Sequence, residues 1–127
     1  MDDVNSLELV LRLGLAAGLG MVIGIEREYR AKRAGMRTHF MVALGSALFM
    51  AVSCHAFGGV GDPGRVAAQI VSGIGFLGAG TIIMNKHIVH GLTTAAGLWV
   101  AAGIGMAAAA GMYVVASGAT VLALVGL

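Results

Sequence analysis

The residues that most suggest chemistry form a polar stripe inside an apolar run. Arg65, Gln69 and Ser72 are spaced i, i+4 and i+7, so a helix would place all three side chains on one face. Arg12 lies at a comparable depth in the first apolar run. Ionisable side chains within a membrane are energetically costly, and for that reason they are candidates for function.

Two interpretations of these arginines remain open. In the first, each arginine has a structural partner, with Glu8 beside Arg12 and Asp62 beside Arg65. In the second, both arginines line a shared polar pocket that faces a substrate. Both also lie near the outer membrane interface, where a long side chain can extend its charge toward water.

Two other motifs lack the surroundings that a ligand site needs. His87 and His90 are only two candidate ligands, whereas zinc takes three or four. Gly73, Gly75 and Gly78 match the dinucleotide pattern G-x-G-x-x-G, which requires a preceding strand and a later acidic residue, and no acidic residue follows them. With no catalytic nucleophile, base and acid in evident combination, the sequence predicts no enzyme activity, no metal site and no cofactor.

The elements that carry these residues are apolar segments long enough to cross a membrane. Hydrophobic residues make up 58% of the chain and charged residues 11%, whereas about 25% of residues are charged in soluble domains. A spanning helix needs about 20 apolar residues. The chain is therefore predicted to be an all-α, polytopic helical membrane protein with glycine-rich packing. Its five spans are expected near residues 7–25, 38–58, 65–84, 92–109 and 112–127.

Local signals suggest where these spans begin and end. Asp62 would cap the third span, with Pro63 at its first helical position, and Thr93 would cap the fourth. The uncharged run 91–127 is too long for one span, so a turn is expected near residues 109–112. The first helix should continue about a turn beyond the membrane, because charged residues there are spaced i, i+4. These pairs are Glu26–Arg30 and Glu28–Lys32.

Positive charge predicts an orientation. Five basic residues lie between the first two spans, as is typical of a cytoplasmic loop, so the N-terminus should be outside and the C-terminus cytoplasmic. Basic residues concentrated in one loop do not favour nucleic-acid binding. Residues 1–127 are expected to form one transmembrane domain, without a soluble C-terminal domain. The five basic residues are Arg27, Arg30, Lys32, Arg33 and Arg37.

The 21 glycines are concentrated in rows that favour close helix packing. The third span is the densest and leaves a second interpretation open, in which the helix unwinds locally and its free carbonyls form an ion site. The glycines expected to pack are Gly73, Gly75, Gly78 and Gly80 in the third span, and Gly14, Gly18, Gly20 and Gly24 in the first.

Several motifs, in the same order and with matching spacing, resemble the membrane domain of the MgtC/SapB family. This resemblance adds Glu26, Arg27, Arg37, Thr93 and Thr94 to the candidate functional residues. The motifs are Gly24-Ile25-Glu26-Arg27-Glu28, Ala34-Gly35-Met36-Arg37-Thr38-His39, the segment from Asp62 to Gly80, and Gly91-Leu92-Thr93-Thr94-Ala95-Ala96 with Trp99.

The resemblance implies a bacterial inner-membrane protein linked to adaptation to low magnesium or acid and to virulence. In the virulence branch it implies inhibition of the proton-translocating ATP synthase. Two functions follow as expectations. One is a regulatory protein that acts by helix contact within membrane lipid, on a membrane-protein partner or as a homo-oligomer. The alternative is a small-ion, magnesium-associated transporter or channel, which is disfavoured because a magnesium path needs oxygen ligands such as carboxylates.

Overall fold

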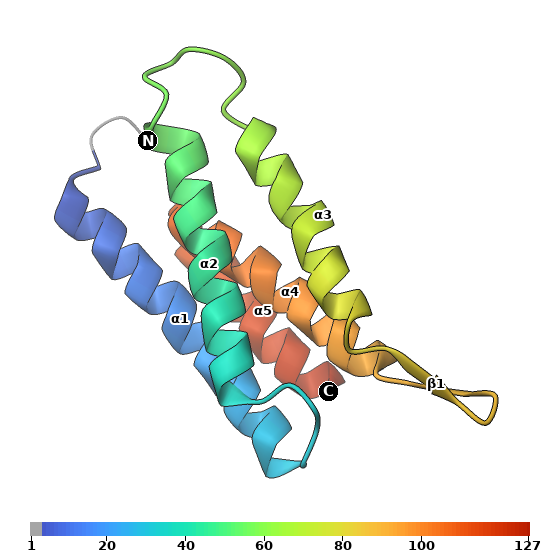
Figure 1. Cartoon of the computed structure of the whole chain (residues 1–127). Coiled ribbons are helices and arrows are strands. Elements are labelled where there is room, and N and C mark those ends of the chain that lie inside the picture. Colours follow the sequence, from blue (N-terminus) through green and yellow to red (C-terminus); the bar gives the residue numbers. More distant parts are fainter. Residues whose placement is uncertain (1–3) are drawn as a thin grey trace.

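The computed structural model describes residues 4–127, which form five helices and one short hairpin. Successive helices run in alternating directions, so the start of α1 and the end of α5 lie at opposite ends of the bundle (Figure 1). The predicted all-α fold is confirmed, with the hairpin between α3 and α4 as its one addition. The elements are α1 (Ser6–Tyr29), α2 (Met36–His55), α3 (Arg65–Ala79), β1 (Ile83–Asn85), β2 (Ile88–His90), α4 (Leu92–Ala109) and α5 (Tyr113–Gly126).

Helix α4 is the centre of the bundle and packs against all four other helices. Its buried residues are mostly alanine, glycine and other small or branched apolar residues, so neighbouring backbones approach closely. Leu98 and Ile104 are among the largest fully buried side chains, together with Ile23 of α1. Helix α3 is peripheral: it contacts α2 and α4 and buries a single narrow stripe along its length.

The outer surface of the bundle is apolar, as expected where lipid is the solvent. Helices α1, α2 and α4 are long and apolar enough to cross a membrane, while α3 and α5 are shorter apolar helices. Large hydrophobic side chains point outward from the short helices as well, including Phe76, Val114 and Val125. Because exposed apolar surface on this scale is rare in soluble monomers, the chain is a helical membrane protein.

The third apolar segment departs from its prediction of a helix extending to residue 84. Helix α3 ends at Ala79, and Ile83–Asn85 pairs antiparallel with Ile88–His90. Lys86 and His87 both have positive φ, as a type I′ hairpin turn requires. The prediction counted uncharged length, which does not register that the segment after α3 is rich in branched residues that favour strands.

The predicted helix caps are also wrong. Asp62 does not cap α3; its Oδ1 accepts a hydrogen bond from the backbone N–H of Gly64 (2.8 Å), which is the N-cap residue. Thr93 lies inside the first turn of α4, whose N-cap is Gly91 in the left-handed region (φ 92°). At α4 the left-handed conformation of the N-cap favours glycine, whereas Gly64 has an ordinary right-handed conformation (φ −87°). The turn after α4 lies where it was predicted, between Ala109 and Tyr113.

Candidate functional site

A basic pocket of about 750 Å³ lies where α1 and α5 end and α4 begins. The loop after α1 forms one wall, β2 and the first turn of α4 form another, and the last residues of α5 complete it. The pocket therefore brings together three residues that the sequence singled out from distant segments. These residues are Arg27, Thr93 and Thr94.

Glu26 holds two arginines of the pocket in place. Its Oε2 accepts a hydrogen bond from Nε of Arg27 (3.0 Å), and its Oε1 pairs with Nε of Arg30 (2.7 Å). The second contact confirms the predicted i, i+4 pair and the continuation of α1 beyond the expected span. The hydrogen bond from Arg27 is the main cause that lowers the pKa of Glu26, with the charges of both arginines adding to it and burial opposing it.

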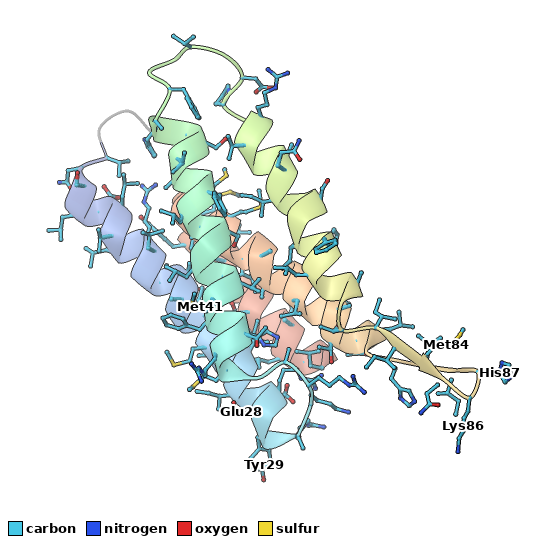
Figure 2. The ribbon with its side chains drawn as sticks, in the orientation of Figure 1. Glu28, Tyr29, Met41, Met84, Lys86 and His87 are labelled. Carbon is cyan, nitrogen blue, oxygen red and sulfur yellow. The ribbon has the colours of Figure 1, made fainter. Side chains whose placement is uncertain are left out.

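Glu28 does not make its predicted pair with Lys32. Its Oε1 instead approaches the backbone N–H of Met36 at 3.4 Å, because the chain leaves the helix after Tyr29 and folds back toward the start of α2. Figure 2 shows Glu28 and Tyr29 at this end of the molecule and Lys86 and His87 at the tip of the hairpin. Arg37 is exposed in the first turn of α2.

The first turn of α4 presents polar groups to the pocket. Its first helical hydrogen bond runs from the N–H of Ala95 to the carbonyl of Gly91 (2.8 Å), so the three preceding N–H groups have no partner within the helix. A side chain at Gly91 would collide with the carbonyl of Thr81, and this contact explains why glycine is required there. Thr94 is 5% exposed and Thr93 is exposed.

Arg12 lies at the opposite end of the bundle, in a separate polar cluster. Its guanidinium donates to Glu8 (3.1 Å), to the hydroxyl of Tyr113 (2.8 Å) and to the carbonyl of Ala109 (2.9 Å). Glu8 is the partner that the sequence suggested. Sequence reasoning missed Tyr113. Its position just after the predicted turn is a signal, because that turn lies at the same end of the bundle as Arg12.

The structure does not bring the polar stripe of α3 to Arg12. Arg65, Gln69 and Ser72 are all exposed, and α3 packs on α2 and α4, whereas Arg12 contacts the α4–α5 turn. Gln69 instead borders a groove between α2 and α3. Among the residues described, Asp62 makes no ion pair with Arg65 and hydrogen bonds to Gly64 in its own turn.

The four glycines of the third segment have different surroundings. A Cβ on Gly78 would contact Ala95 of α4 (3.4 Å to its carbonyl oxygen), and one on Gly80 would meet the carbonyl of Leu77 in the same helix (3.2 Å). Around Gly73 and Gly75 the space is open. Helix α3 is continuous through Gly73, Gly75 and Gly78, so the local unwinding that was considered is not observed there, and Gly80 follows as the C-cap residue.

His39 is a buried polar residue that sequence reasoning did not include in the site. It is fully buried, and its Nδ1 lies 2.9 Å from the carbonyl of Gly35. Its Nε2 has no partner among the described residues and faces Gly97 of α4. Its position in the Arg37-Thr38-His39 motif is the signal that marks it.

Several known proteins are similar to part of the chain. A putative magnesium transporter of Escherichia coli K12, YhiD, is 49% identical over 96 residues, which cover 70% of this chain and 45% of that protein. Protein MgtC of Salmonella typhimurium is 51% identical over 87 residues, which cover 68% of this chain and 37% of that protein. The chain thus spans less than half the length of these relatives.

No solved structure matches the chain. An uncharacterised protein of Synechocystis is 49% identical over 89 residues, or 70% of this chain and 38% of that protein. The MgtC family matches residues 13–127, which include all five helices almost completely. The chain belongs to the MgtC family.

Proposed function

We propose that the chain is a bacterial inner-membrane regulator that acts by contacting a helix of another membrane protein during growth in low magnesium or acid. The observation that carries this proposal is a groove of about 460 Å³ between α2 and α3, lined almost entirely by apolar side chains. Gly45 and Gly73 border it, and a Cβ on either would meet nothing within 4 Å. Small residues on a lipid-facing surface allow a partner helix to approach closely.

The proposed arrangement has five crossings, with the basic end in the cytoplasm and the N-terminus outside. Alternating helix directions support it, as does the cluster of basic residues after α1. Helix α3 has 15 residues and α5 has 14. At about 1.5 Å per residue they are shorter than a hydrocarbon core of about 30 Å, so they cross only where flanking residues or a thinner bilayer compensate.

Transport of magnesium is the alternative, and the printed name of the Escherichia coli relative favours it. The placement of the acidic residues weighs against it. Within residues 4–127, no group of three or more His, Cys, Asp or Glu is arranged to hold a metal ion. Glu8, Glu26, Glu28 and Asp62 all lie near helix ends, whereas a magnesium path needs oxygen ligands along its length. The proposed role is also non-enzymatic.

A glycine substitution in the groove tests the regulatory function. In a bacterium lacking its own MgtC-family protein, Gly73→Leu should fill the groove and abolish growth in low magnesium, at normal membrane abundance. Gly14→Leu is the matched control, because Gly14 is also exposed and has nothing within 4 Å of its Cβ. Equal growth of the two variants would contradict the proposal.

A photo-crosslinker at position 69, beside the groove, identifies the partner in the same strains. The expected product is an adduct with a membrane protein that disappears in Gly73→Leu; the ATP synthase is the candidate from the family resemblance, and a second copy of the chain is the other possible product. Purified protein in liposomes provides the opposing test. Magnesium flux carried by the purified protein alone would overturn the regulatory proposal in favour of transport.

A further inference from the structure

The basic pocket contains hydrogen-bond donors that neither the fold nor the proposed function uses. The N–H groups of Leu92, Thr93 and Thr94 open the 18-residue helix α4, and no side chain caps them. All three residues line the pocket. A helix N-terminus carries partial positive charge and free N–H groups, which together favour an anion.

Arg27 is the second, independent feature. It lines the pocket, yet its side chain is only 3% exposed. Its Nε donates to Glu26, and within the described residues neither terminal nitrogen makes a hydrogen bond, although neither is fully enclosed by protein. A buried guanidinium is costly unless its donors are satisfied, so an acceptor is expected at this position.

Thr94 points to the same ligand chemistry from the opposite wall. It is only 5% exposed, and within residues 4–127 no hydrogen bond from its hydroxyl to the protein is found. Thr94 nevertheless lines the pocket. A hydroxyl beside free N–H groups and a guanidinium is a combination that suits an oxyanion.

The acidic side chains near the pocket already have protein partners. Glu26 uses both oxygens on Arg27 and Arg30, and Glu28 turns toward Gly35 and Met36. Arg30, Lys32 and Arg33 add exposed positive charge around the opening. The four basic side chains of the lining outnumber Glu26 and the terminal carboxylate of Leu127, so the electrostatic potential in the pocket favours an anion over a neutral ligand.

We propose that the basic pocket binds a phosphate group. Arg27 and the first turn of α4 hold its oxygens, and the exposed basic residues neutralise the rest of its charge. The pocket lies just beyond the expected end of the first span, a depth at which the phosphate can belong to an anionic lipid headgroup or to a solute in the cytoplasm. This inference is independent of the α2–α3 groove, so a negative result at either place leaves the other standing.

Binding is measured on the purified chain in neutral detergent by equilibrium dialysis with inorganic phosphate at constant ionic strength. Saturable binding is expected, and Arg27→Gln should weaken it by about tenfold or more, because a charge-assisted hydrogen bond is lost. Lys86→Gln is the matched control: it removes the same charge at the hairpin tip and should leave binding unchanged (Figure 2).

Two further variants keep the test decisive if Arg27→Gln does not fold. Thr94→Val retains the volume of the side chain and removes only the hydroxyl, and Arg33→Gln changes an exposed residue of the pocket. Both should weaken phosphate binding while the melting temperature without phosphate stays near that of the parent. Equal weakening by Lys86→Gln would indicate diffuse charge and overturn the proposal.

A lipid arm separates the two sources of phosphate. The chain is placed in nanodiscs of phosphatidylcholine with or without phosphatidylglycerol, and retained lipid is counted by native mass spectrometry. Phosphatidylglycerol that is retained and lost in Thr94→Val identifies a headgroup site; binding of inorganic phosphate without lipid competition identifies a solute site. Absence of both, or retention that no pocket variant changes, would overturn the proposal.

Discussion

At the residue scale, Glu26 controls how the basic end responds to acid. Its carboxylate holds Arg27 and Arg30 together, and the hydrogen bond from Arg27 lowers its pKa below the ordinary value. A carboxyl group whose pKa is lower in the folded than in the unfolded state stabilises the fold above the unfolded value. That contribution is lost as the pH falls through the folded value.

The expected result is a loss of thermal stability in acid that depends on Glu26. Between neutral pH and the ordinary pKa of glutamate, the parent should melt at a higher temperature than Glu26→Gln, and below that range the two melting curves should converge. Scanning fluorimetry of both proteins in detergent across this pH series measures the difference. A constant gap at every pH would mean that the charge of Glu26 is not what stabilises the fold.

Residue types also show what the sequence could and could not predict about polar contacts. The depth of Arg12 and its pairing with Glu8 could be predicted from the sequence, because i, i+4 partners are fixed by the helix itself. The shared pocket with Arg65 was not a sound prediction, since depth along two segments does not determine which helices touch. Arg27 and Thr94 line one pocket through tertiary packing that no local spacing encodes, and the family motifs marked both.

At the element scale, the two glycine pairs of helix α1 have different surroundings. A Cβ on Gly20 would lie 2.5 Å from the carbonyl oxygen of His39, and one on Gly24 would lie 2.5 Å from Cα of Met36. Gly14 and Gly18 have nothing within 4 Å. Thus the same small-xxx-small spacing predicts close packing for both pairs, but only the second pair meets α2 and the chain that enters it.

This difference predicts opposite outcomes for a single added methyl group. Gly24→Ala should destabilise the protein by about 1–3 kcal/mol, because the obstructing atoms belong to the backbone and cannot rotate away. Gly18→Ala should be neutral or slightly stabilising, because alanine favours the helix. Unfolding of both variants and the parent in detergent with increasing denaturant gives the comparison. Similar losses for the two would contradict the close approach of α1 to α2.

The number of helices was predictable from the sequence, whereas several of their ends were not. Segments exposed to lipid must satisfy their backbone hydrogen bonds internally, and helices meet this requirement. Uncharged stretches separated by charged loops therefore indicate the number of helices. The ends depend on which residue takes a positive φ. Gly91, and the Lys86–His87 turn of the hairpin, adopt such conformations. Nothing in an apolar count distinguishes a short strand from the last turn of a helix.

At the scale of the whole molecule, the alternating helices place the loop after α1, the hairpin and the end of α5 at one end, opposite the loop before α3 (Figure 1). Lys32, Lys86 and Asp62 are exposed markers of these two ends. If basic residues fix the orientation, Lys32 and Lys86 face the cytoplasm and Asp62 faces outward. Single cysteines at these positions, in a protein whose Cys54 is replaced by alanine, report the arrangement.

In intact cells, an impermeant thiol reagent should label Asp62→Cys, while Lys32→Cys and Lys86→Cys react only after the membrane is opened. Labelling of both lysine positions in intact cells, with Asp62→Cys protected, would reverse the orientation and place the basic pocket outside. Labelling of Lys86→Cys without Lys32→Cys would be more serious, because the two positions lie on opposite sides only if one of α2 and α3 crosses and the other does not. That result would overturn the five crossings, and α3, with 15 residues, is the helix whose length falls short of the bilayer.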